Sequence, residues 1–206
     1  ALVVRTYKET ILRELASFAS IPVINALSDE SHPCQAMGDI YTLMEKWGDV
    51  KGRILVYVGD SNNVALSLLQ IASRMGLTVR IASPQGYTFP QRIIKWGLRK
   101  GFEFTNDPVR AVKGAHVIYT DVWTSMGQEE EREKRLVAFK GFQINMKLLK
   151  KAEKDVLLMH CLPAHRGEEI DHEALESRHS IVFDQAENRL HIQKAILVRL
   201  IRSHKK

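Results

Sequence analysis

The chain has 206 residues, a formal net charge of +6 and 45% hydrophobic residues, a composition typical of an ordinary globular protein. It lacks both the roughly 18 consecutive apolar residues of a membrane span and the pattern of a secretory signal at its start. Basic residues alternate with acidic ones and form no aromatic-interleaved stripe, so we expect no nucleic-acid-binding face. The two cysteines, Cys34 and Cys161, predict neither a disulfide framework nor a four-ligand zinc site, and they fit a reducing, cytoplasmic setting.

The first 48 residues predict a small α/β unit. Strands are expected at residues 2–4 and 22–24, and helices at residues 11–19 and 36–47, the second ended by Gly48. So few elements cannot bury their own apolar faces. We therefore interpret residues 1–48 as the remnant of a domain, with a boundary in the segment 48–52.

A regular alternation of strands and helices follows. The predicted strands lie at residues 54–58, 78–82, 103–105, 116–120, 156–159 and 181–183. The predicted helices lie at residues 63–75, 90–100, just after the cap Asp107, from 129 onwards, and at 145–152, 172–176 and 186–202. This order predicts an α/β fold with a doubly wound parallel sheet and helices on both faces, preceded by the remnant of a second α/β domain. The expected units are residues 1–48, 49–185 and 186–206, and the final helix is expected to return to the first domain.

Polar clusters at residues 32–35, 60–63, 121–127 and 160–163 follow predicted strands. Ligands of open α/β sheets bind beyond the carboxyl ends of the strands, so these clusters predict a small-molecule site. His32 and Gln35 lie where free helix N–H groups favour an anion or a polarised carbonyl oxygen, although helix capping is an alternative. Arg5 follows another strand and suits either a phosphate or carboxylate ligand or a surface ion pair.

The clusters at residues 60–63 and 121–127 predict recognition of an amine. One glycine stands where the G-x-G-x-x-G fingerprint has three, so Asn62 and Asn63 fit a zwitterion better than a pyrophosphate, with capping as the alternative. Asp121, with the turn at residues 125–127, fits an ammonium group or is an ordinary loop carboxylate. Residues 121–128 contain no Lys or Arg, which disfavours a substrate with a carboxylate side chain.

His160 and Cys161 are adjacent on an extended segment, so their side chains should point to opposite sides. A direct hydrogen bond between them is therefore not expected. Cys161 is predicted to contact a substrate amine as a thiol or thiolate, the alternative being a merely buried thiol. Nothing in the spacing of the histidines predicts a metal site.

Taken together, residues 32–35, 59–63, 121–127, 160–163 and 186–189 resemble the corresponding segments of ornithine carbamoyltransferases in order and spacing. The resemblance implies transfer of the carbamoyl group of carbamoyl phosphate to the side-chain amine of L-ornithine, giving L-citrulline and phosphate in arginine biosynthesis, without a metal or organic cofactor. It implies that carbamoyl phosphate is bound by Arg5, His32, Gln35, Cys161, Leu162 and Arg189. It implies that ornithine is bound by Asn63, Asp121, Ser125 and Met126. The expected catalytic residues are Cys161, His32 and Arg5.

The chain also departs from the family pattern. Family members carry a Ser-x-Arg-Thr-Arg phosphate-binding loop in a first half that has no counterpart here. We therefore expect a fragment, or a chain that works with a polypeptide supplying that loop, inactive alone and assembled as a homo-oligomer such as a trimer. Two alternatives stay open: a non-catalytic amino-acid-binding or assembly module, and a carbamoyltransferase for putrescine or acetylornithine.

Overall fold

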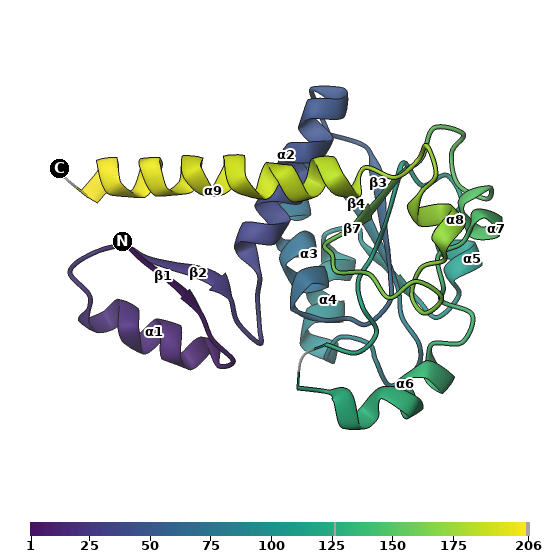
Figure 1. The fold of residues 1–206 in the computed structure, drawn as a ribbon, viewed down its shortest axis with the longest axis horizontal. Coiled ribbons are helices and arrows are strands. Elements are labelled where there is room, and N and C mark those ends of the chain that lie inside the picture. Colours follow the sequence, from purple (N-terminus) through teal and green to yellow (C-terminus); the bar gives the residue numbers. More distant parts are fainter. Residues whose placement is uncertain (126, 205–206) are drawn as a thin grey trace.

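The computed structural model describes residues 1–125 and 127–204, and a five-stranded parallel sheet lies at its centre (Figure 1). In spatial order its strands are β5 (Glu103–Thr105), β4 (Thr78–Ala82), β3 (Ile54–Val58), β6 (Val117–Thr120) and β7 (Leu157–His160). Within this sheet the chain runs from the central strand β3 outwards through β4 to β5. It then crosses to the opposite side of β3, where β6 and β7 follow. The predicted doubly wound α/β fold is confirmed.

Helices cover both faces of the sheet, because adjacent residues of each strand point to opposite sides. Leu55 and Tyr57 belong to one buried cluster, whereas Val56 and Val58 belong to the other. The first cluster includes residues of α2 (Pro33–Trp47), α3 (Asn63–Met75) and α4 (Gln91–Arg99). The second includes residues of α5 (Pro108–Ala111), α6 (Arg132–Ala138), α7 (Met146–Leu149) and α8 (His172–Leu175). A short 3-10 turn, Glu129–Glu131, leads into α6.

Local sequence explains where several helices begin and end. Asn62 caps α3 by accepting the backbone N–H of Ala65 at 3.0 Å, and Gly76 ends that helix in the left-handed conformation. Helix α2 begins three residues before its predicted start at residue 36, because Pro33 is tolerated at the first helical position. The helix predicted at residues 145–152 is shorter, since Asn145 caps it from outside and Lys150 ends it.

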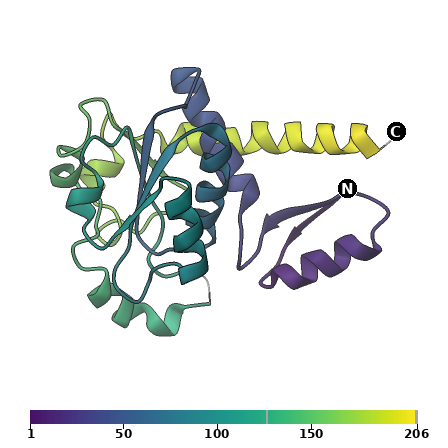
Figure 2. The ribbon, with the colours of Figure 1, turned by 180° about the vertical axis from the view of Figure 1, so that it is seen from behind.

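The first segment forms a separate two-stranded parallel sheet. It consists of β1 (Leu2–Arg5), α1 (Glu9–Phe18) and β2 (Val23–Leu27), with β1 and β2 paired in parallel. Figures 1 and 2 show it at the opposite end of the molecule from α7 and α8. Its apolar side chains remain largely open to solvent: Phe18 is 85% exposed and Tyr7 is 74% exposed. This segment therefore presents a large apolar surface.

The strand predicted at residues 181–183 is wrong, because α9 (Val182–His204) already begins there. The apolar run reflects burial at a junction: Val182 is 1% exposed, while Phe183 is 70% exposed. Only an isolated bridge between Ser180 and Leu158 remains of the expected pairing. Helix α9 packs on α2 and then runs beyond the sheet towards the first segment (Figure 1). None of the helices within the described residues is long and apolar enough to cross a bilayer.

Candidate active site

The switch point of the sheet lies between β3 and β6, which pair in parallel although their connections lead to opposite sides. Such a point opens a crevice beyond the carboxyl ends of the strands. The loop after β3 carries residues 60–63, and the loop after β6 begins at Asp121. Strand β7 pairs with β6 and delivers His160 and Cys161 to the same edge. Three of the four predicted polar clusters therefore meet here.

Asp121 is the centre of the group of side chains at the switch point. It is 7% exposed, and its carboxylate accepts hydrogen bonds from Cys161 Sγ on Oδ1 at 2.9 Å and from Asn62 Nδ2 on Oδ2 at 2.8 Å. Burial, and then the neighbouring Asp121 charge, raise the pKa of the Cys161 thiol well above its usual value. Of the two forms considered from the sequence, the structure thus favours the thiol over the thiolate.

His160 points away from Cys161, as expected for neighbours on an extended segment. Its Nε2 lies 3.0 Å from Glu169 Oε1, and both side chains are completely buried. Its Nδ1 accepts the backbone N–H of Leu162 at 2.8 Å, so the ring proton belongs on Nε2 and is donated to Glu169. Leu162 has a φ of 54°, in the left-handed region that side chains disfavour. The His160–Glu169 pair therefore holds the turn that follows Cys161.

A second group forms around His32 at the start of α2, with Arg189 from α9 and Arg5 from the end of β1. Arg189 donates a hydrogen bond to Gln35 Oε1. His32 is buried, and burial together with the charges of Arg189 and Arg5 lowers its pKa to about 4. The guanidinium groups of Arg5 and Arg189 thus act on the same ring although they come from opposite ends of the chain. At neutral pH His32 is uncharged and offers a ligand one N–H donor and one acceptor nitrogen.

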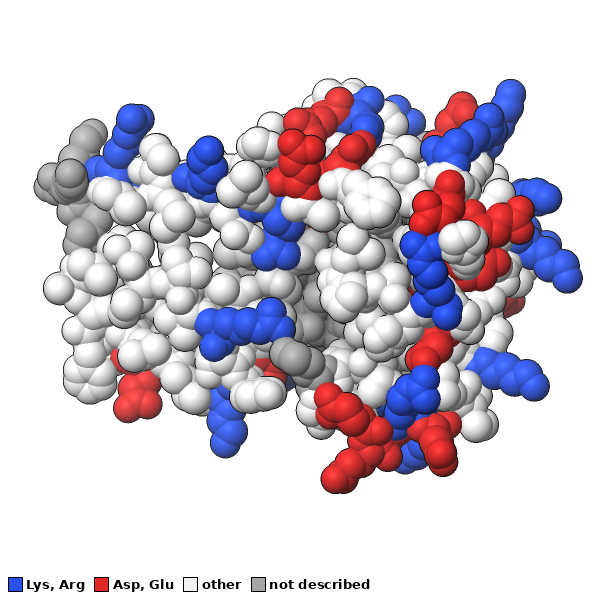
Figure 3. All heavy atoms as spheres, in the orientation of Figure 1, with Lys and Arg blue, Asp and Glu red and all other residues white. Residues whose placement is uncertain are grey.

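The two groups are joined by the start of α3. Ser67 Oγ accepts the backbone N–H of His32 at 2.8 Å, and Asn63 Nδ2 donates to the backbone oxygen of Ser28 at 2.6 Å. Asn63 thus faces the first segment, whereas its neighbour Asn62 contacts Asp121. Figure 3 shows the surface hollowed between the first segment and the part that holds the five-stranded sheet, with basic side chains at the rim.

The loop after β6 supplies the remaining predicted residues. The backbone N–H of Ser125 donates to Gln128 Oε1 at 3.1 Å, which closes a turn that begins four residues after Asp121. The buried hydroxyl of Thr124 has no hydrogen-bond partner within residues 1–125 and 127–204. Met126, also predicted to bind ornithine, lies outside the described residues.

Sequence reasoning missed one side chain that shapes this edge. Arg135, from the charged helix α6, is 5% exposed and donates to Asp60 Oδ2 at 2.6 Å and to the backbone oxygen of Trp123 at 2.8 Å. It thereby ties the loop after β3 to the loop after β6. Nothing local marks one arginine among many charges as buried. Asn62, for which the sequence predicts either zwitterion binding or helix capping, caps α3 and also contacts Asp121.

Two groups of potential metal ligands converge, although the spacing of the histidines predicts none. Within each, the ligand atoms lie within 4.8 Å of one another, and the groups are Asp121, His160 and Cys161, and His165, Glu168 and Glu169. In the first group both ring nitrogens of His160 are already in hydrogen bonds. In the second, Glu169 accepts from His160, and Glu168 pairs with Arg132. Many of these potential ligand atoms are therefore already engaged in hydrogen bonds or ion pairs with other described residues.

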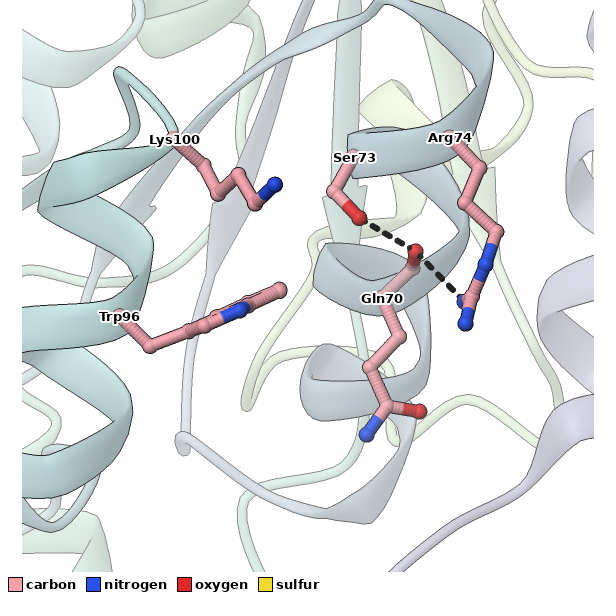
Figure 4. A pocket seen from close by; sticks show the side chains of 5 residues that line it. All are labelled: Gln70, Ser73, Arg74, Trp96 and Lys100. Atoms are coloured by element: carbon pink, nitrogen blue, oxygen red, sulfur yellow. Dashed lines mark hydrogen bonds between the residues drawn. The ribbon is translucent and has the colours of Figure 1, made fainter.

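A surface hollow of about 490 Å³ lies between α3 and α4, well away from these groups (Figure 4). Trp96 and Lys100 line it on one side, and Gln70, Ser73 and Arg74 on the other. Ser73 and Arg74 both donate to the backbone oxygen of Gln70, at 2.8 and 3.3 Å. These α3 residues lie near the end of the helix opposite to Asn63, so this hollow is not part of the candidate site.

Comparison with known families identifies the family to which the chain belongs. The profile described as "Aspartate/ornithine carbamoyltransferase, Asp/Orn binding domain" matches residues 51–200. The chain belongs to this family. The companion profile, "carbamoyl-P binding domain", matches residues 1–45, which contain Arg5, His32 and Gln35.

Individual relatives agree with the family assignment. The chain is 51% identical to the ornithine carbamoyltransferase of Pyrococcus abyssi, over 98% of this chain and 65% of that protein. It is 51% identical to the anabolic ornithine carbamoyltransferase of Pyrococcus furiosus, over 96% of this chain and 64% of that protein. The ornithine carbamoyltransferase structure from Thermus thermophilus superposes with a TM-score of 0.88 at 47% identity, over 96% of this chain and 65% of that one. The chain thus spans just under two thirds of these relatives.

Proposed function

We propose that this chain is the ornithine-binding part of an ornithine carbamoyltransferase, together with the end of its carbamoyl-phosphate-binding part. Residues 1–48 would belong to the carbamoyl-phosphate-binding part and residues 49–185 to the ornithine-binding part. Residues 186–206 would return to the carbamoyl-phosphate-binding part. The observation that carries the proposal is that the start of α3 joins the group of Asp121 and Cys161 to the group of His32, Gln35 and Arg189. The names of the relatives indicate the reaction.

Carbamoyl phosphate would lie against the group at the start of α2. The guanidinium groups of Arg5 and Arg189 suit bidentate contact with its phosphate oxygens. Neutral His32 would donate one N–H to the carbamoyl oxygen, where negative charge develops during the reaction. Gln35 would contact the same substrate, and Cys161 and Leu162 would lie at its carbamoyl end.

Ornithine would lie against the loops after β3 and β6. Asp121 suits its ammonium group, and Asn63, Ser125 and Met126 would hold the remaining polar groups. The side-chain amine must attack as the neutral form. With a reference pKa of about 10.4 for such an amine, deprotonation at pH 7 costs about 4.6 kcal/mol.

Proton removal would accompany the transfer. The amine nitrogen forms a bond to the carbamoyl carbon, the bond from that carbon to the phosphate oxygen breaks, and phosphate leaves with the electron pair. Cys161 is already protonated and hydrogen-bonded to Asp121, with a raised pKa, so it is poorly suited to accept the proton as a thiol. We therefore assign the proton to the departing phosphate and a positioning role to Asp121 and Cys161.

The complete enzyme would need a polypeptide supplying the phosphate-binding loop. Support comes from the apolar surface of the first segment and of α9, where Leu190 is 59% exposed and Val198 is 49% exposed. We expect this surface to be covered by that polypeptide or within a homo-oligomer such as a trimer. Both cysteines are free thiols, which fits a cytoplasmic reaction.

A citrulline assay tests the proposal. The chain is incubated with carbamoyl phosphate and ornithine, alone and with a polypeptide corresponding to the first third of a relative. Citrulline should form only in the combined sample, and a chain carrying Asp121→Asn should form much less. A combined sample that associates but forms no citrulline would refute the proposal.

Calorimetry separates the remaining alternatives. Ornithine binding without affinity for carbamoyl phosphate in the combined sample would indicate an amino-acid-binding module instead. Faster turnover of putrescine or acetylornithine than of ornithine would instead identify a carbamoyltransferase for another amine.

A further inference from the structure

Asp39 is a carboxylate in the middle of α2 that has no part in the reaction proposed above. It is completely buried, and its Oδ1 accepts hydrogen bonds from Gln35 Nε2 at 2.8 Å and from Gln185 Nε2 at 2.7 Å. Its Oδ2 has no hydrogen-bond partner among the residues that the structure describes. Burying such a group is costly unless its charge is compensated, so packing alone does not explain it.

The amide side chains of Gln35 and Gln185 connect Asp39 to two different parts of the candidate site. Gln35 accepts a hydrogen bond from Arg189 through its Oε1. Gln185 accepts the backbone N–H of His160 through its Oε1 at 3.0 Å. One hydrogen-bonded path therefore runs through Arg189, Gln35, Asp39, Gln185 and His160. It begins in the proposed carbamoyl phosphate subsite and ends at the residue before Cys161.

The chemistry of the carboxylate fixes the direction of this path. Asp39 Oδ1 accepts a hydrogen bond from each glutamine, so both turn their NH₂ groups towards it. Their carbonyl oxygens then point outwards, one to a guanidinium and the other to a backbone N–H. The second N–H of Gln185 is also used, because Nε2 lies 3.1 Å from the hydroxyl of Tyr119. Turning either amide around would bring two acceptors together at Asp39.

We infer that Asp39 is a positioning residue that couples the two subsites, holding Gln35 in one and, through Gln185, the backbone of His160 in the other. The meaning of the subsites rests on the proposed function, whereas the hydrogen-bonded path does not. Loss of the acceptor should therefore loosen the segment that carries Cys161, even without substrates.

Native-state hydrogen exchange of the His160 amide tests the path. It is measured by NMR on the whole chain and expressed relative to the Leu158 amide of the same strand. Asp39→Leu removes the acceptor, whereas Asp39→Asn keeps one acceptor oxygen. Thr42→Val is the matched control, since Thr42 Oγ1 accepts from Asn188 Nδ2 at 3.1 Å across the same α2–α9 interface, without a link to either subsite.

Asp39→Leu should lower the relative protection of His160 about tenfold, and Asp39→Asn by less than about threefold. Thr42→Val should leave it unchanged, because any loss of global stability affects both amides alike. Equal protection in Asp39→Leu and Thr42→Val would overturn the inference. Where Asp39→Leu does not fold, the smaller Asp39→Ala removes the same acceptor, leaves the Gln185 acceptor of the His160 amide in place, and carries the same expectation.

The combined enzyme supplies a second readout. Asp39→Leu should lower kcat on the order of a hundredfold, with a smaller change in either KM, because it misplaces Cys161 and Leu162. Thr42→Val should keep kcat within about twofold. Equal kcat in these two variants would again overturn the inference. Absence of citrulline with the unsubstituted chain would refute the proposed function, and the exchange experiment would still decide the role of Asp39.

Discussion

Replacing Asp39 by Asn should remove a destabilisation that grows with pH. Burial raises the pKa of Asp39 from its ordinary 3.8 to about 7, although hydrogen bonds from Gln35 and Gln185 partly oppose this. The charged or titratable groups that face it are Arg189 of α9, Tyr119 of β6 and Cys161 after β7. Arg189 stays charged, and the raised pKa values of Tyr119 and Cys161 keep both neutral below pH 8. Asp39 therefore titrates alone within this group.

Whether stability rises or falls with pH follows from the two pKa values of Asp39, 3.8 in the unfolded chain and about 7 in the folded chain. Below pH 3.8 Asp39 is protonated in both folded and unfolded chains, and its contribution to stability is fully present. As the pH rises towards 7, the unfolded chain loses this proton while the folded chain keeps it, so the free energy of unfolding falls. The whole difference corresponds to about 4 kcal/mol, of which about 2 kcal/mol is lost between pH 5 and pH 7. The amide that replaces the carboxyl group in Asp39→Asn has no such proton to lose.

Urea unfolding, followed by tryptophan fluorescence at about pH 5, 6, 7 and 8, measures this effect. Asp39→Asn should gain about 2 kcal/mol relative to the unsubstituted chain between pH 5 and pH 7, whatever its offset at pH 5. Thr42→Val, which keeps Asp39, should follow the unsubstituted chain in parallel. Parallel profiles for Asp39→Asn and the unsubstituted chain would refute the reasoning, because Asp39 would then titrate near its ordinary value despite its burial.

Three further predictions test the site. In the combined enzyme, Cys161→Ala should reduce turnover more than carbamoyl phosphate affinity, and equal losses in both would contradict its positioning role. Glu169→Leu leaves the buried ring N–H of His160 without an acceptor and should cost about 1–3 kcal/mol in urea unfolding. Glu169→Gln should cost less, and equal costs would show that the hydrogen bond does not hold the turn. Arg135→Met should cost about 3 kcal/mol because it leaves Asp60, whose side chain is only 14% exposed, without its partner. Adding Asp60→Asn should recover much of that loss, and a double variant as unstable as Arg135→Met would contradict the ion pair's importance.

The sheet could be predicted from the sequence because its determinants are local. The central strand β3 and its neighbours β6 and β7 are short, mostly apolar runs, and the polar clusters at residues 60–63, 121–127 and 160–163 follow those runs. The opposite directions of His160 and Cys161 also follow from the backbone alone. The apolar run at residues 181–183 was misread because its residues are buried at a helix start, where alternation does not distinguish a strand from a helix.

The contacts that organise the site could not be predicted, because they join residues far apart in the chain. Asp39 and Gln185 are 146 positions apart, and Asp60 and Arg135 are 75 positions apart. Neither Asp39 nor Arg135 has a local pattern that distinguishes it from a polar residue on a helix surface. Three-dimensional neighbours, rather than residue type, decide that Asp39 is a buried acceptor and Arg135 a buried donor.

The packing of α2 on α9 explains how the two proposed subsites are connected. A Cβ atom at Gly38 would lie 3.0 Å from Arg189 Cδ, so the absent side chain allows α9 to approach closely enough for Arg189 to reach Gln35. One turn along the same interface, Asp39 meets Gln185. The proposed carbamoyl phosphate subsite and the Cys161 segment are therefore connected through the buried contact of two helices. Because that contact is packed and hydrogen-bonded, a displacement of α9 would move Arg189 and the backbone of His160 together.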